Sequence, residues 1–140
     1  MNLVIDASAL AAALVDCGPE GEWAEQFLLD ASLCGPQVLP LEVANILRRA
    51  ELAGIIDATS SAQAHQALGA LPIALFDYEP LADRVWSLRQ NLTAYDASYV
   101  ALAEMLDCEL ATLDRHLARA AGHQCRVILP PNAEAQNSLE

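Results

Sequence analysis

The chain has 140 residues, 54% of them hydrophobic and 19% charged, which predicts a single globular domain that buries a core of its own. Its formal net charge is −12, and all seven basic residues are Arg. Proteins that hold nucleic acid by charge alone are basic, so the composition excludes that class. It favours a site for cations or a basic partner protein.

Nothing in the sequence indicates export or a membrane segment. The apolar run at 3–15 is interrupted by Asp6 and Ser8, follows no positive residue and is too short to span a bilayer. We therefore expect a cytoplasmic protein. The cysteines show neither C-x-x-C pairs nor matching His spacing, so we expect reduced, largely buried thiols, with a disulfide or a metal site as the alternative. They are Cys17, Cys34, Cys108 and Cys125.

In chain order, the first predicted element is a strand at 2–6, whose consecutive aliphatic residues indicate burial on both faces. Helical patterns follow at 8–15 and, after a turn with Gly and Pro, at 20–31, where acids in the first turn suit the helix dipole. A short strand is expected at 33–35. The next helix covers 40–53, with Pro at its start and Gly after its end.

The second half of the chain continues the alternation. Hydroxyl residues at 59–61 offer caps for a helix that ends near residue 70, and a strand follows at 72–76. Helices are then expected at 79–91 and at 95–106, the latter with Tyr99 on its apolar face.

The last predicted elements are a strand at 109–113, a short helix at 115–120 and a strand at 126–129. Strands that alternate with helices predict an α/β domain over residues 1–130, with a mostly parallel sheet of about four to five short strands flanked by helices. The polar tail at 131–140 is expected to be disordered.

Two acidic residues are expected at one edge of this sheet, because ligands of parallel α/β sheets bind beyond the carboxyl ends of the strands. Asp6 closes the first strand, and Asp114 directly follows the strand at 109–113. Each is explained equally well as the cap of the helix that follows it. Ser8 is either a cap or a partner of a nearby carboxylate, and Thr112 alternates with Leu113 so as to share a side with Asp114.

Two further acids lie in helical segments. Glu42 is surrounded by aliphatic residues, and helical spacing places it on one face with Asn45 and Arg49. A carboxylate beside apolar groups needs a partner or a metal to stay charged, although a surface Glu in a first helical turn is the alternative. Asp96 begins the helix at 95–106, where a simple cap is the competing explanation.

Taken together, these four acids indicate a metal site. Oxygen ligands without His or Cys favour Mg²⁺ or Mn²⁺, and such an ion activates a water and offsets charge on a phosphate. Four carboxylates in one pocket repel each other, so we expect raised pKa values in the metal-free protein. The histidines are scattered singly and show no ligand spacing.

Four segments of the chain carry a family resemblance: VIDASAL at 4–10, LEVANILRR at 41–49, LTAYDASYVALA at 92–103 and ATLDRHLARA at 111–120. In this order they resemble the motifs of the PIN-domain ribonucleases, specifically the VapC-type toxins of bacterial toxin–antitoxin pairs. The resemblance runs from residue 2 to about residue 129, nearly the whole chain.

The resemblance implies a PIN-like fold and a metal-dependent endoribonuclease that acts as a toxin on single-stranded or looped RNA, with Mg²⁺ or Mn²⁺ as cofactor. It also implies a homodimer and neutralisation by a small VapB-type antitoxin whose tail occupies the active-site groove. Ser8, Asn45 and Thr112 would support the acids. The catalytic and metal-binding residues would be Asp6, Glu42, Asp96 and Asp114.

Basic residues near the motif acids raise the question of RNA contacts. Arg48, Arg49, Arg115 and Arg119 are expected either to contact RNA phosphates or to form surface ion pairs. The alternative function is a non-catalytic acidic α/β binding module that acts only through a basic protein partner. A phosphoryl-accepting receiver domain is disfavoured because the chain has no Lys.

Overall fold

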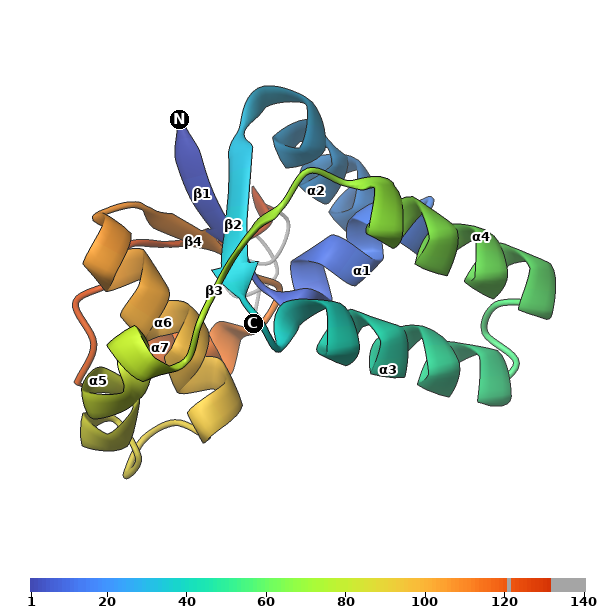
Figure 1. Ribbon diagram of the computed structural model, residues 1–140. Helices are drawn as coiled ribbons and strands as arrows, with labels where there is room; N and C mark the ends of the chain where they lie inside the picture. Colours follow the sequence, from blue (N-terminus) through green and yellow to red (C-terminus); the bar gives the residue numbers. More distant parts are fainter. Residues whose placement is uncertain (121, 132–140) are drawn as a thin grey trace, which may run out of the picture.

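The computed structural model describes residues 1–120 and 122–131. Within them it confirms the predicted α/β domain with a single parallel sheet of five strands in the order β3-β2-β1-β4-β5 (Figure 1). The strands are β1 (Asn2–Ile5), β2 (Ser32–Pro36), β3 (Ala74–Phe76), β4 (Glu109–Ala111) and β5 (Val127–Ile128).

Helices cover both faces of the sheet. The chain moves from β1 outward to β3 and then returns to β4, so right-handed crossovers place the helices before β3 on one face and those after it on the other. Figure 1 shows this division, with α1 to α4 on one side and α5 to α7 on the other. The helices are α1 (Ala7–Val15), α2 (Pro19–Asp30), α3 (Leu39–Leu52), α4 (Ala58–Ala70), α5 (Ala82–Ser87), α6 (Ala94–Leu106) and α7 (Arg115–Arg119).

Most element positions agree with the sequence-based expectations, but the predicted helix at 79–91 is wrong in its extent. The segment forms a 3₁₀ turn, η1 (Glu79–Leu81), then α5, and then tight turns up to residue 92. Backbone N–H groups of Leu88 and Asn91 donate to carbonyls three residues earlier, which tightens the chain. Leu88 and Leu92 are both buried, so core packing decides the path where helical periodicity predicts a continuous helix.

The core forms around β1, whose Val4 and Ile5 are fully buried. Alanines let α1 approach both the sheet and α2 closely. A Cβ on Gly21 of α2 would lie 1.8 Å from the carbonyl oxygen of Asp16, so only glycine fits this contact. The close packing around β1 and α1 fixes the position of the sheet edge where β1 ends.

The expectation of reduced cysteines is confirmed, because all four are free. The expectation of burial holds for Cys34, whereas Cys108 and Cys125 are half-buried and Cys17 is exposed. Among the described residues, no helix is long and apolar enough to span a membrane. The tail expected to be disordered lies outside the described residues from position 132 onward.

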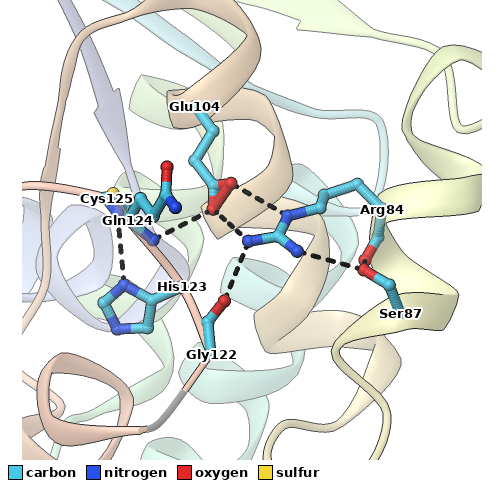
Figure 2. A network of polar contacts seen from close by, with 7 residues as sticks. All are labelled: Arg84, Ser87, Glu104, Gly122, His123, Gln124 and Cys125. Carbon is cyan, nitrogen blue, oxygen red and sulfur yellow. Dashed lines mark hydrogen bonds and ion pairs between the residues drawn. The ribbon is translucent and has the colours of Figure 1, made fainter.

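A polar network joins α5, α6 and the segment before β5 (Figure 2). The Arg84 guanidinium donates to both carboxylate oxygens of Glu104, at 2.9 and 3.0 Å, and to the carbonyl of Gly122 at 2.9 Å. The Gln124 amide also donates to Glu104. Burial opposes ionisation of Glu104, but the bonds from Arg84 and Gln124 outweigh it and hold the pKa of Glu104 below its ordinary value.

Candidate active site

The candidate acids gather at the carboxyl edge of the sheet, where β1 and β4 lie side by side. The chain leaves β1 toward one face of the sheet and leaves β4 toward the other, so this is the topological switch point at which α/β sheets bind ligands. Asp6 directly follows β1, and Thr112 and Asp114 follow β4. Asp6 and Asp114 therefore lie at the same edge of the sheet, as the sequence predicts.

Asp6 is a buried carboxylate held by three groups. Its Oδ1 accepts hydrogen bonds from the Ser8 hydroxyl at 2.6 Å and from the Ala9 amide at 3.0 Å, and its Oδ2 accepts one from Thr112. Burial raises the pKa of Asp6, these bonds oppose the rise, and repulsion from Asp96 adds to it. The bonds use three of roughly four acceptor positions of a carboxylate, which leaves Oδ2 with room for one more ligand.

Glu42 lies in the first turn of α3 and is held from the opposite face of the sheet. The hydroxyl of Tyr99, on α6, donates to Glu42 Oε1 at 2.7 Å. Burial raises the pKa of Glu42, the bond from Tyr99 opposes the rise, and repulsion from Asp96 and Asp6 adds to it. The odd position of this Glu among apolar residues thus has a physical explanation.

The helical pattern predicts Tyr99 on an apolar helix face but does not predict its contact with Glu42. The side chain is 1% exposed, and burial with the negative charge of Glu42 raises the pKa of Tyr99. A buried phenol needs a hydrogen-bond partner, so an aromatic residue with a hydroxyl in a core-facing position was the available signal.

Asp96 is the acid that connects the others. It is not the cap of α6, as one interpretation of the sequence has it, because Thr93 is the N-cap and accepts a bond from the Asp96 amide. Burial raises the pKa of Asp96, repulsion from Asp114 adds to it, and Thr93 and His116 oppose it. Asp96 in turn raises the pKa values of Asp6 and Glu42. Asp96 therefore lies near enough to the other three candidates for its charge and theirs to influence the pKa values of this group.

Asp114 serves as the N-cap of α7, as one reading of the sequence expects. Its Oδ1 accepts from the amides of His116 and Leu117 at 2.8 and 3.2 Å. Its own amide donates to Thr112, which links it to the partner of Asp6. A cap uses one carboxylate oxygen here, so the capping role and a role in the site are compatible.

Two of the three expected supporting residues contact one of the candidate acids in the structure. Ser8 and Thr112 both donate to Asp6, and Ser8 also accepts from the Leu113 amide at 3.1 Å, which fastens α1 to the end of β4. Asn45 is exposed and lines a hollow together with Glu42.

The four arginines are placed differently from one another. Arg48 lines a groove between α3 and α4 with Glu51 and His65, away from the face that carries Glu42. Arg49 lies two helical turns after Glu42 in α3, so it is on the same helix face as Glu42. Arg115 and Arg119 are on α7, the former half-buried and the latter exposed.

The acids supply the ligand chemistry that Mg²⁺ or Mn²⁺ prefers, since all four offer hard carboxylate oxygens. Burial and mutual repulsion disfavour ionisation of Asp6, Glu42 and Asp96, and a bound cation relieves both. Among the described residues, no three such side chains already surround one point. In the described part of the chain the four acids therefore do not form a preformed set of three metal ligands.

The fold and the site define a class of protein, an α/β domain with an acidic centre at the switch point of its sheet. A family model described as PIN domain matches residues 3–123. VapC ribonuclease Mb0985 of Mycobacterium bovis is 37% identical over 129 residues, covering 92% of this chain and 98% of that protein. Ribonuclease VapC1 of Mycobacterium tuberculosis is 40% identical over 130 residues, covering 90% and 96%. The chain therefore belongs to the PIN domain family, as the four motif segments predict.

Solved structures agree on the fold. PAE2754 of Pyrobaculum aerophilum superposes with a TM-score of 0.70 at 20% identity, covering 100% of this chain and 91% of that one. VapC20 of Mycobacterium tuberculosis, described as a toxin that cleaves the sarcin-ricin loop, has a TM-score of 0.65 at 13% sequence identity. The match covers 86% of this chain and 95% of that one. VapBC2 of Rickettsia felis, solved with a promoter DNA fragment, has a TM-score of 0.65 at 9% sequence identity. The match covers 92% of this chain and 98% of that one. These likenesses confirm the predicted PIN-like architecture.

Proposed function

We propose that the protein is a metal-dependent endoribonuclease that acts as the toxin of a toxin–antitoxin pair. Membership of the PIN domain family and the names of its relatives, VapC ribonucleases at 37–40% identity, support the reaction class. The observation that carries the proposal is the position of Asp96. Thr93, and not Asp96, caps α6, and the negative charge of Asp96 adds to the raised pKa values of Asp6 and Glu42, so capping does not account for its position.

Asp6, Glu42, Asp96 and Asp114 are the proposed catalytic residues and the groups that hold Mg²⁺ or Mn²⁺. When bound, the metal supplies an activated water and offsets the charge that develops on the phosphate. Other side chains of the protein orient the acids that would bind the metal. Ser8 and Thr112 orient Asp6, and α1 and β4 in turn hold them in place.

Glu42 is proposed to be held in its productive orientation by Tyr99. The hydroxyl donates to one carboxylate oxygen and leaves the other free for a ligand. Because Tyr99 is buried on α6, one turn after Asp96, the same helix sets the positions of both acids. The separation between Glu42 and Asp96 is therefore controlled by packing within the core.

RNA carries charge of the same sign as this protein, so local cations must offset the repulsion. The metal would do so at the scissile phosphate. Arg49 on the Glu42 face, with Arg115 and Arg119 on α7, would contact neighbouring phosphates. Arg48 faces the groove between α3 and α4, which makes it the weakest candidate for such a contact.

The proposed partners are a VapB-type antitoxin and a second copy of the chain. Structural neighbours include VapBC2 of Rickettsia felis and a toxin–antitoxin complex from Klebsiella pneumoniae, the latter with a TM-score of 0.57 at 18% identity over 91% of this chain and 97% of that one. The formal net charge of −12 would attract a basic antitoxin segment toward the acidic site. Association with the antitoxin should accordingly weaken as salt is raised.

Cleavage of RNA by the purified protein tests the proposed function. Total RNA is incubated with Mg²⁺ or Mn²⁺, and the ends of the fragments are sequenced. The wild type is expected to cut at defined positions, chelator to abolish the cuts, and Asp6→Asn to remove them while thermal unfolding still shows a folded protein. Asp30→Asn, at an exposed acid at the end of α2, is the matched control and should cleave normally.

Two results would overturn the proposal. Full cleavage by Asp6→Asn would show that the activity belongs to another site or to a contaminant. The absence of any cleavage by the wild type, together with unchanged thermal stability when Mn²⁺ is added, would favour the non-catalytic binding module instead.

A further inference from the structure

An open hollow lies directly beside the proposed catalytic acids. Its volume is about 430 Å³, and it is lined by Val38 before α3, by Leu41, Glu42 and Asn45 on α3, and by Tyr95 on α6. Hollows of this size hold small organic groups. The Tyr99 hydroxyl of α6 donates to Glu42 of α3 at 2.7 Å, so the two helices meet beside the hollow. The hollow is thus formed by the two helices that also supply Glu42 and Asp96.

The hollow and the acid cluster share a wall. Glu42 belongs to both, and Tyr95 immediately precedes Asp96. The first turn of α6 that carries Tyr95 is fixed, because the Ser98 hydroxyl donates to the Tyr95 carbonyl at 2.6 Å and Thr93 caps the helix. The backbone of Tyr95 is therefore held in a fixed position beside Asp96.

The walls combine large apolar surfaces with a polar edge. The Tyr95 side chain is 60% exposed and Leu41 is 72% exposed. Asn45 adds an amide that both donates and accepts hydrogen bonds, and the one charged group in the lining, Glu42, is negative. A phosphate would be repelled there. A flat, uncharged group with apolar faces and hydrogen-bonding edges matches the lining.

We propose that this hollow binds the unpaired nucleobase next to the scissile phosphate of the RNA, with Tyr95 stacking on the base and Asn45 facing its edge. This inference rests on the proposed ribonuclease function. A base is joined to its phosphate through a single sugar, so a phosphate at the acid cluster brings a neighbouring base to the adjoining hollow. Stacking requires a base that is not paired, which selects single-stranded or looped RNA.

A second copy of the chain is the competing occupant of the exposed Leu41 and Tyr95 side chains. An apolar partner surface would cover the Asn45 amide without giving it hydrogen bonds, which carries a cost. A nucleobase edge supplies those bonds. The polar part of the lining therefore favours the base.

The test uses short RNAs that span a mapped cleavage site and carry one abasic nucleotide at successive positions. With the wild type, loss of the base at one position adjoining the cut should lower kcat/KM about ten-fold, the size expected for one stacked base. Tyr95→Ala should lose the same factor on the intact RNA, chiefly through KM, and should lose nothing further on that abasic RNA. Tyr95→Phe should retain the wild-type value.

The matched control is Tyr78→Ala, because Tyr78 is another exposed tyrosine, 55% accessible, and it does not line the hollow. It should cleave as the wild type does. The proposal is overturned if no adjoining abasic position matters, if the losses from Tyr95→Ala and the missing base multiply, or if Tyr95→Ala changes the molecular mass in solution, which would assign the hollow to a second copy. All of these results require a wild type that cuts RNA. If the wild type cuts no RNA, the proposed ribonuclease function itself is wrong, and the proposed base site is wrong with it.

Discussion

At the scale of single residues, the proposed site depends on hydroxyl groups that hold carboxylates. Ser8 and Thr112 hold Asp6, and Tyr99 holds Glu42. Such partners fix the orientation of a metal ligand, and losing one commonly costs roughly 10- to 100-fold in metal affinity or activity. The contribution of each hydroxyl can be measured by removing the oxygen alone.

Tyr99→Phe removes one buried oxygen and keeps the ring that fills the core. We expect cleavage in the single-turnover regime to fall about ten-fold, because Glu42 loses the group that orients it. The free energy of unfolding should fall by about 1–2 kcal/mol, since a hydrogen bond to a charged group is lost. Tyr78→Phe, at an exposed tyrosine, is the control and should change neither quantity. Unchanged cleavage by Tyr99→Phe would show that Glu42 needs no orienting partner.

The raised pKa values of the acids predict how the metal-free stability depends on pH. Burial and mutual repulsion raise the pKa values of Asp6, Glu42 and Asp96 in the folded state. Between the ordinary carboxyl range near 4 and these raised values, the folded protein binds more protons than the unfolded chain does. The contribution of these groups to stability is therefore favourable at low pH and is lost as the pH rises through their folded-state values.

Asp96→Asn should for this reason raise the melting temperature of the metal-free protein by a few degrees at pH 7.5, because one member of the repelling set is gone. The difference should narrow as the pH falls toward the ordinary carboxyl range, and it should reverse when Mn²⁺ stabilises the wild type. Asp30→Asn is the control. A variant that melts below the wild type at pH 7.5 in chelator would contradict the repulsion.

Single residues also show how far the sequence predicts the site. The sequence predicts the four acids of the proposed site from their positions at strand ends, at helix starts and in motif segments. The sequence does not predict the role of Tyr99. Helical periodicity assigns its side chain to a helix face but gives no information on a hydrogen bond from its hydroxyl to a carboxylate 57 positions away. Tertiary hydrogen bonds of this kind are set by packing across the sheet.

At the scale of elements, helix starts do two jobs in this fold. Asp6 and Asp114 cap α1 and α7, and Asp96 lies in the first turn of α6. The positive end of a helix favours a carboxylate, so the same positions that stabilise the helices also collect negative charge at one sheet edge. This double use explains why the cap and the catalytic interpretations of these acids were both open from sequence.

Substitutions at Asp114 separate capping from charge. Asp114→Asn keeps an oxygen that accepts from the His116 and Leu117 amides, so its stability should be close to that of the wild type. Asp114→Ala loses the cap and should cost about 1 kcal/mol in chemical denaturation. Both should lose cleavage, because both remove the carboxylate. If Asp114→Asn cleaves normally, Asp114 is a structural cap only.

The region between β3 and α6 shows why element boundaries were harder to predict. Residues 79–91 have a helical pattern, yet the chain turns after Ser87 so that Leu88 and Leu92 are buried. The Arg84–Glu104 pair then joins α5 to α6, and hydrogen bonds to Gly122 and Gln124 join both helices to the segment before β5 (Figure 2). Local periodicity carries no information about this long-range ion pair.

At the scale of the whole molecule, the α/β alternation and the parallel sheet were predictable because each strand is a short apolar run between helical patterns. The strand order was not predicted, since it depends on which crossovers reverse direction. That reversal, between β1 and β4, places the switch point of the sheet at the edge where Asp6 and Asp114 lie. The overall negative charge agrees with the proposed function, because it favours the binding of cations at the proposed site and of a basic protein partner.

The binding of Mn²⁺ tests most directly the claim that the carboxylate cluster is the metal site of this enzyme. Electron paramagnetic resonance of free Mn²⁺ gives the bound fraction during titration of the wild type and of Asp96→Asn, with Asp30→Asn as control. The wild type and the control should bind Mn²⁺ alike, and Asp96→Asn should bind it at least about ten-fold more weakly. Equal affinity in all three proteins would contradict the claim.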